Sequence, residues 1–272
     1  MNVALFVPCY VDQLYPHVAI AALGLLEALG ITVAVPEGAA CCGQPPANAG
    51  FERRAEHTLG AFVSTYAPYD RVVVLSGSCA VHVRSHAGSL GAAGAQVAER
   101  TTELCAFLHD EVGLDAVASL GASFPRRVAV HVGCHALRGL GLARPTELQG
   151  PRFDKVRALL GTVQGLTFAE LSRPDECCGF GGTFAVAEPA ISAKMGRDRL
   201  RDYDAHDAEA VVSTDVSCLM HLGGLAARGG VRLPMLHVAE VLWSEERRAN
   251  SEESERVRSS LLAPRSSLGG PS

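Results

Sequence analysis

The tripeptide Cys41-Cys42-Gly43 occurs twice in this chain, the second time as Cys177-Cys178-Gly179. In each half a single cysteine precedes the pair and a further cysteine, directly after a serine, follows it, so eight of the nine cysteines fall into one repeated pattern. These are Cys9, Cys41, Cys42 and Cys79 in the first half, and Cys134, Cys177, Cys178 and Cys218 in the second. The repetition predicts two lobes of related structure.

Vicinal cysteines indicate metal or redox chemistry. Adjacent thiols bond to each other only under strain, but their thiolates can bind neighbouring atoms of one cluster. Disulfides would need an oxidising compartment, and an odd cysteine count with no secretory start does not predict one. Zinc sites usually contain short knuckles such as Cys-x-x-Cys, which neither repeat has, and inert buried thiols explain only one or two cysteines. Iron-sulfur ligation by all eight cysteines is the leading interpretation.

The composition is that of an ordinary folded protein. Of the 272 residues 48% are hydrophobic, which suffices for one large core or for two domains. A net charge of -5 without a basic cluster argues against nucleic acid as a main partner. The most membrane-like stretch, 18–35, is interrupted by Gly24 and Gly30 and ends in a strand-like run, so we expect a buried helix and strand and no membrane span.

Each cysteine of the pattern is expected shortly after a strand. Apolar runs predict strands at 2–8, 31–35, 71–75, 127–132, 166–171 and 210–213. Helical periodicity predicts helices at 14–29, 51–66, 155–160, 188–202 and 218–228, and residues 76–79 are expected to form a turn. Alternating strands and helices imply an α/β fold with parallel sheets flanked by helices. Because ligands bind at the carboxyl ends of parallel strands, four thiolates per lobe can converge there.

The repeat also defines a division of the chain. We predict a first cysteine-rich repeat at 1–122, a second at 123–244 and a disordered tail at 245–272, which is charged and Ser-rich and then Gly/Pro-rich. Residues 139–150 form a surface insertion in the second repeat. Segments 103–108 and 237–242 align, each opening the last helix of its half, and in that register Cys105 faces Ala239. Cys105 is therefore expected to pack in the core.

Four histidines lie near the thiols in sequence. His82 and His221 each follow a cysteine by three residues, while His131 and His135 bracket Cys134. They can donate hydrogen bonds to cluster sulfur or relay protons, or they can simply belong to a polar helix face, and sequence position does not decide between the two. They are not counted as ligands.

The loop Gly179-Phe180-Gly181-Gly182 resembles a dinucleotide-binding loop but lacks its third glycine and its strand-and-helix setting. A loop that lets backbone pass close to a cluster is the favoured interpretation, with a simple turn as the alternative. This loop makes the second lobe the stronger candidate for a redox centre.

Several separated motifs resemble a known family. The Cys-Cys-Gly repeats are similar to the cysteine-rich domain found in heterodisulfide reductase, and over residues 1–243 the chain resembles the lactate utilization protein A family. The motifs that carry this resemblance are VPCYVD at 7–12, PEG at 36–38, CCGQP at 41–45, SGSC at 76–79, CCGFGGTF at 177–184 and TDVSCLMH at 214–221.

The resemblance implies a cytoplasmic subunit of a three-protein iron-sulfur system that oxidises L-lactate to pyruvate. Its partners would be a ferredoxin-like iron-sulfur subunit and a third subunit. Heterodisulfide reductase has Cys-x-x-Cys as the third element of each repeat, whereas here Ser76 and Asp215 occupy the first of those positions. Four thiolates per site suit a conventional cluster such as [4Fe-4S], or one with an oxygen ligand, and the chain would hold one or two clusters. Alternatives are a thiol-disulfide or quinone-linked reductase subunit, and a docking scaffold that binds zinc or no metal.

Overall fold

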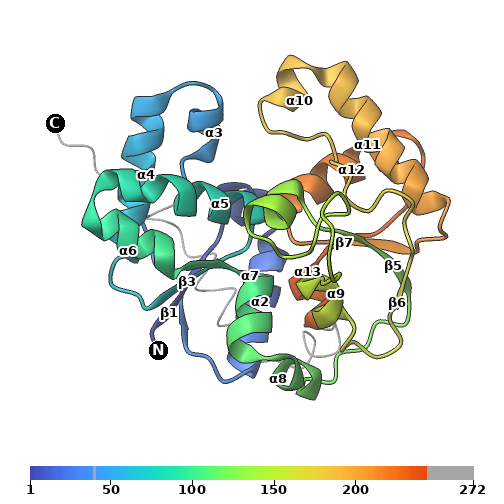
Figure 1. Cartoon of the computed structure of the whole chain (residues 1–272), viewed down its shortest axis with the longest axis horizontal. Coiled ribbons are helices and arrows are strands. Elements are labelled where there is room, and N and C mark those ends of the chain that lie inside the picture. Colours follow the sequence, from blue (N-terminus) through green and yellow to red (C-terminus); the bar gives the residue numbers. More distant parts are fainter. Residues whose placement is uncertain (39–40, 244–272) are drawn as a thin grey trace.

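The computed structural model describes residues 1–38 and 41–243. These residues form two four-stranded parallel sheets flanked by helices, each built from one half of the chain (Figure 1). The predicted α/β class with two pseudo-repeated lobes is therefore confirmed. The predicted disordered tail at 245–272 lies outside the described residues, and the predicted division between residues 122 and 123 stays a prediction.

The two sheets have the same topology. The first has the order β2-β1-β3-β4 and the second the order β6-β5-β7-β8, and every neighbouring pair is parallel. The strands are β1 Val3–Phe6, β2 Val33–Ala34, β3 Arg71–Val74, β4 Thr101–Glu103, β5 Arg127–His131, β6 Thr167–Phe168, β7 Ala210–Ser213 and β8 Met235–His237. The central strands of each sheet thus carry corresponding positions of the two repeats.

Thirteen α-helices connect these strands within the described ranges. They are α1 Cys9–Leu14, α2 Pro16–Ala28, α3 Gln44–Asn48, α4 Glu52–Tyr66, α5 Gly77–His86, α6 Ala92–Arg100, α7 Leu104–Phe107, α8 Leu114–Ser119, α9 Lys155–Leu160, α10 Phe184–Ala187, α11 Pro189–Asp204, α12 Val216–Arg228 and α13 Val238–Leu242. Shorter helical turns lie at Ala87–Leu90, Leu108–Val112 and His135–Gly139.

The central strands bury both of their faces, as expected for a parallel sheet. In β1, Val3 and Leu5 enter a core shared by both halves, whereas Ala4 and Phe6 enter a core of the first half alone. This alternation follows the period of two that a strand imposes on its side chains. The second sheet repeats it, with Ala129 of β5 in a core confined to the second half. The lobes are therefore joined by a common apolar interior.

Helices from both halves fill the shared core. α2 contacts α13, α7 contacts α9, and these helices lie in the centre of Figure 1. Gly24 of α2 faces the indole of Trp243, where an added Cβ would lie 2.9 Å from the ring. The close approach of α2 to the end of α13 therefore requires glycine at this position.

Four predicted elements differ from the structure in instructive ways. The helix expected at 14–29 is interrupted at Tyr15 because the residue before a proline avoids helical backbone angles. The strands expected at 31–35 and 166–171 shorten to two residues each, since they pair on one side only, as edge strands. The turn expected at 76–79 is instead the start of α5, which Ser76 caps by accepting a hydrogen bond from the Cys79 backbone N–H.

Within the described ranges, no helix is both long enough and apolar enough to cross a bilayer.

Glu103 is the last residue of β4, which is the final strand of the first half. Its buried carboxyl group caps α7 by accepting hydrogen bonds from the backbone N–H groups of Cys105, at 2.7 Å, and Ala106, at 3.2 Å. Burial raises the pKa of this carboxyl group to about 8. At the corresponding place in the second half, His237 caps α13 through the Ala239 N–H at 3.2 Å. The predicted alignment of 103–108 with 237–242 is thus matched by paired helix caps.

The raised pKa of Glu103 predicts a pH-dependent stability. Between about pH 5 and about pH 8 the folded chain holds a proton that the unfolded chain has released, so the free energy of unfolding falls by about 1.4 kcal/mol per pH unit on account of this group. Glu103→Gln keeps an accepting oxygen for the cap and removes the titration. We expect the stability difference between variant and wild type to shift in favour of the variant as pH rises, measured by denaturant unfolding. A difference that stays constant with pH would contradict this assignment.

Candidate metal centres

The cysteines of each half lie at the carboxyl ends of the central strands. In the first half Cys9 begins α1 directly after β1, and Cys79 lies in the first turn of α5 directly after β3. Cys41 and Cys42 precede α3. In the second half Cys134 follows β5, Cys218 lies in the first turn of α12 after β7, and the vicinal pair lies in the loop before α10. The predicted placement of the cysteines after strands is thus found in both repeats.

The four thiols of the first half form a connected chain of side-chain interactions. Hydrogen bonds from Cys42 and Cys9 lower the pKa of Cys41, which favours its thiolate form. The pKa of Cys9 is raised because its thiol donates to Cys41. The pKa of Cys42 is also raised, chiefly by Cys41 and then by Cys79. The four sulfur atoms are therefore neighbours of one another, in the order Cys9, Cys41, Cys42 and Cys79.

The second half repeats this arrangement. Hydrogen bonds from Cys134 and Cys178 lower the pKa of Cys177 to about 2. The pKa of Cys134 is raised by its bond to Cys177, and that of Cys178 by Cys177 and then Cys218. The backbone N–H groups of Gly179 and Phe180 point at the vicinal sulfurs, at 3.3 Å from Cys177 Sγ and 3.5 Å from Cys178 Sγ. Such N–H groups stabilise sulfur that carries negative charge.

These features suit a thiolate-bound metal cluster. Metal ligation needs deprotonated sulfur, and in each half one thiol whose pKa is lowered lies among others that can lose their protons to an incoming cation. The donors come from three separate segments per half, and all nine cysteines of the chain are free thiols. The arrangement can therefore hold soft metal ions or an iron-sulfur cluster.

The glycine after each vicinal pair has a steric reason. Gly43 has φ 93° and Gly179 has φ 88°, a left-handed backbone that favours glycine. A Cβ at Gly43 would lie 2.9 Å from the Ala55 carbonyl oxygen of α4, and one at Gly179 would lie 2.6 Å from the Ser192 carbonyl oxygen of α11. The glycine of each Cys-Cys-Gly motif thus lets a helix approach the pair, a role different from the cluster clearance that the sequence suggested.

Asp215 and Ser76, which replace cysteines of the heterodisulfide reductase pattern, meet across the boundary between the lobes. The Ser76 hydroxyl donates to Asp215 Oδ2 at 3.0 Å, and the Ser78 N–H donates to the same oxygen at 3.2 Å. The Tyr10 hydroxyl donates to Oδ1 at 3.1 Å, and the Ser217 hydroxyl does so at 2.7 Å. Burial and the Asp215 charge raise the pKa of Tyr10. Both carboxylate oxygens are thereby used to join the two halves.

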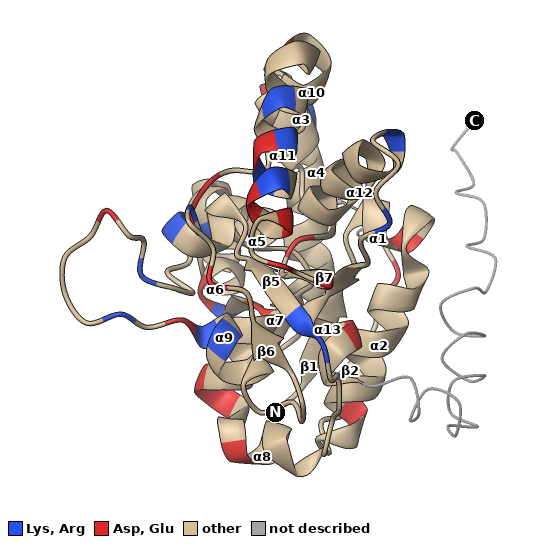
Figure 2. Ribbon diagram, turned by 90° about the vertical axis from the view of Figure 1, so that its right-hand side faces the viewer, with Lys and Arg blue, Asp and Glu red and all other residues tan. Residues whose placement is uncertain are grey.

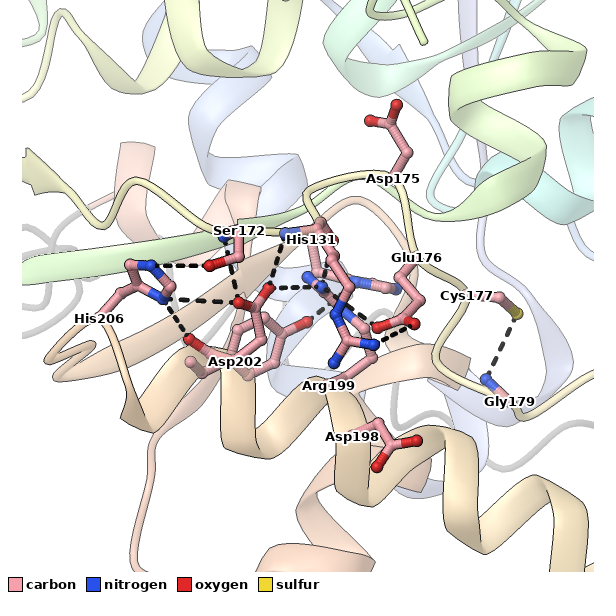
Figure 3. A network of polar contacts seen from close by, with 12 residues as sticks. His131, Ser172, Asp175, Glu176, Cys177, Gly179, Asp198, Arg199, Asp202 and His206 are labelled. Carbon is pink, nitrogen blue, oxygen red and sulfur yellow. Dashed lines mark hydrogen bonds and ion pairs between the residues drawn. The ribbon is translucent and has the colours of Figure 1, made fainter. Parts of the chain in front are cut away.

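A buried charge cluster positions the loop that carries Cys177 (Figure 3). Arg199 of α11 is fully buried and forms an ion pair with Asp202 at 3.0 Å. Asp202 accepts hydrogen bonds from the backbone N–H groups of Ser172, at 3.1 Å, and Arg173, at 3.3 Å, and the Arg173 carbonyl accepts from Arg199. The loop before the vicinal pair is therefore fixed to α11, and no motif in the sequence indicated this contact.

The four neighbouring histidines occupy different environments. His82 and His131 are buried, and burial lowers the pKa of each to about 4, so both rings are neutral at pH 7. His221 Nε2 lies 3.3 Å from the Ser192 carbonyl oxygen, and burial lowers its pKa. His135 is exposed, with Nδ1 3.8 Å from Cys134 Sγ. The polar-face interpretation therefore fits His135 but not the two buried rings.

Cys105 lies away from both sets of thiols. It is fully buried in the shared core together with Ala239, and burial raises the pKa of its thiol. These observations agree with the packing role that the sequence alignment predicts for it.

A cavity of about 570 Å³ lies beside the second set of thiols, and sequence reasoning missed it. Its walls include Val132 and Asp175, which precede Cys134 and Cys177 in the sequence by two residues each. Arg144 and Arg152, from the charged loop that extends before α9 in Figure 2, also line it. In the described part of the chain neither guanidinium has a carboxylate partner, whereas Arg157 in the same wall is paired with Glu170. The same wall also contains the carboxyl groups of Asp154, Glu170 and Asp175, so the lining carries both signs of charge.

Comparison with known proteins finds the repeat independently. The family described as a cysteine-rich domain, CCG, matches residues 3–84 and 128–223. Lactate utilization protein A of Geobacillus kaustophilus is 36% identical over 248 residues, which cover 89% of this chain and 98% of the relative. Lactate utilization protein A of Bacillus subtilis is 34% identical and covers 89% and 99%, and that of Shouchella clausii is 35% identical and covers 90% and 100%. The two matched segments each contain one complete set of four cysteines, and with these relatives the chain belongs to the lactate utilization protein A family.

Proposed function

We propose that this chain is the iron-sulfur electron-transfer subunit of a complex that oxidises L-lactate to pyruvate. The observation that carries the proposal is the convergence of four cysteine side chains in each half, where Cys41 and Cys177 each accept hydrogen bonds from two neighbouring cysteines. Support for the substrate comes from the relatives, which are named for lactate utilization. The ligands assigned to the first centre are Cys9, Cys41, Cys42 and Cys79, and those assigned to the second are Cys134, Cys177, Cys178 and Cys218.

The number of centres suits the proposed reaction. Oxidation of lactate to pyruvate releases two electrons and two protons, and an iron-sulfur cluster, when bound, takes up electrons one at a time. Two centres in one chain provide for both electrons. Four thiolates per centre favour [4Fe-4S] clusters, and Asp215, whose two oxygens accept hydrogen bonds that join the lobes, is not assigned as a ligand.

The proposed complex has two further subunits. The family resemblance implies a ferredoxin-like iron-sulfur subunit, which would exchange electrons with this chain, and a third subunit. This chain contains no ferredoxin-like cysteine motif of its own, so these partners would supply the remaining carriers. We place the complex in the cytoplasm, where reducing conditions keep free thiols available for metal.

Reduction by substrate tests the proposal. We expect L-lactate, added without oxygen to the assembled complex, to bleach the visible absorbance of the clusters in this subunit. One pyruvate should form for every two electrons that the clusters take up. A complex that is reduced by a dithiol or a quinol but not by lactate would contradict lactate oxidation and favour another reductase of the cysteine-rich family. Glycolate and glycerol 3-phosphate serve as matched substrate controls.

A further inference from the structure

The second half holds a nitrogen donor among its sulfurs. His131 is the last residue of β5, so its side chain lies at the carboxyl end of the strand that leads to Cys134. A ring nitrogen of His131 and the sulfur atoms of Cys178 and Cys218 all lie within 4.8 Å of one another. Three soft or borderline donors at such separations can share one metal ion.

The hydrogen bonding of His131 leaves one nitrogen for that role. Nδ1 lies 3.0 Å from the hydroxyl of Tyr203 on α11, and the contact fixes the orientation of the ring. Nε2 is buried and has no hydrogen-bond partner anywhere in residues 1–38 and 41–243. A buried polar atom without a partner costs about 1–3 kcal/mol. Ligating histidines in proteins commonly use their second nitrogen for such an orienting bond.

The tyrosine is itself held in place. Tyr203 is fully buried, and the Arg199 guanidinium lies 4.7 Å from the centroid of its ring. Arg199 belongs to the charge cluster that fixes the loop before Cys177. The same residues therefore position both the vicinal thiols and the imidazole.

The first half has no imidazole at the end of its first strand; its own buried ring, His82 of α5, also has an Nε2 without a hydrogen-bond partner among the described residues, but it does not form a three-donor group with two cysteine sulfurs there. Phe6 ends β1 and pairs with Val74, just as His131 ends β5 and pairs with Ser213. The phenyl ring of Phe6 packs edge-on against Phe62, at 4.9 Å between ring centroids, and Tyr66, at 5.8 Å. The equivalent position of the first centre is thus apolar, and the difference between the halves is local to the metal site.

We propose that His131 Nε2 is a ligand of the second centre, alongside Cys178 and Cys218, so that the chain carries one all-thiolate centre and one mixed sulfur and nitrogen centre. The inference rests on the proposed function, since it assumes that the thiols bind an iron-sulfur cluster. His131 then takes the place of one of the four thiolates assigned to this centre, and a neutral imidazole there leaves less negative charge on the cluster and raises its reduction potential. The second centre is therefore the more readily reduced of the two, and electrons within the chain run from the first centre to the second.

The test uses the full chain with its clusters in place and histidine labelled with ¹⁵N. We expect pulsed electron paramagnetic resonance of the reduced protein to show a strong coupling to a histidine nitrogen. His131→Phe, which copies Phe6 of the first half, should abolish that coupling, retain iron and sulfide because four thiols remain, and lower the potential of the second centre. His57→Phe is the matched control, since its ring is exposed on α4, and it should leave both coupling and potential unchanged.

Each result decides the question. A protein with iron and sulfide bound but without a strong histidine coupling would overturn the ligand role of His131, as would a coupling that persists in His131→Phe or disappears in His57→Phe. If His131→Phe fails to fold, His131→Gln takes its place in the same comparison. A chain that binds no iron and sulfide at all would instead overturn the proposed function, so the two failures are distinguishable.

Discussion

Replacing Cys177 and Cys178 together by serine is expected to remove the second cluster completely and to leave the first. The two sulfurs are the middle members of the connected chain in the second half, and Cys177 is the one whose pKa is lowered. Serine oxygen is a hard donor that stays protonated at neutral pH and binds iron far less well than thiolate does. We expect iron and sulfide to fall to about half, with loss of one set of resonance signals, measured after purification without oxygen.

Two matched variants make this result specific. Cys41→Ser with Cys42→Ser should remove the other half of the iron and the other set of signals. Cys105→Ser, in the shared core away from both sets of thiols, should leave iron and sulfide unchanged even if it lowers stability. Equal losses in the Cys105 variant and the vicinal-pair variants would contradict the ligand assignment.

Asp215→Ala is expected to destabilise the fold by about 3 to 5 kcal/mol. The carboxylate is buried and accepts hydrogen bonds from the hydroxyls of Tyr10 and Ser76 in one half and of Ser217 in the other. Alanine leaves these donors buried without an acceptor at the point where the two lobes join. Denaturant unfolding of the chain, with and without its clusters, measures the change in the free energy of unfolding.

The size of the effect is best judged against two other variants. Asp215→Asn keeps one accepting oxygen and is expected to lose about half as much. Asp198→Ala removes surface ion pairs to Lys194 and Arg201 on α11 and is expected to change the free energy of unfolding little. If Asp215→Ala were as mild as Asp198→Ala, the carboxylate would not be the joint between the lobes.

Much of the fold follows from local sequence. Buried strands that lie inside a parallel sheet read as apolar runs, so β1, β3, β5 and β7 are visible without a structure. Because parallel strands end at one edge, the cysteines after these runs could be expected to converge. Because Cys-Cys-Gly occurs twice, the sequence predicts one such group of converging cysteines in each half, and both halves do have the same strand order.

Other features depend on contacts that sequence spacing does not encode. The hydrogen bonds of Asp215 to Tyr10 and Ser76 join residues from different repeats, so no local motif indicates them. The contrast between His131 and Phe6 is visible in the aligned strands only once the register of each sheet is known. The steric role of Gly179 requires the path of α11, which packs against the loop from a later part of the chain.

The metal content of the purified protein tests the central claim most directly. The chain should be isolated without oxygen and assayed for iron, acid-labile sulfide and zinc. We expect several iron atoms per chain with an equal amount of sulfide and no stoichiometric zinc, because the eight thiols hold iron-sulfur clusters. Stoichiometric zinc without sulfide, or a folded chain that retains no metal when iron and sulfide are supplied, would contradict the account and favour a docking scaffold.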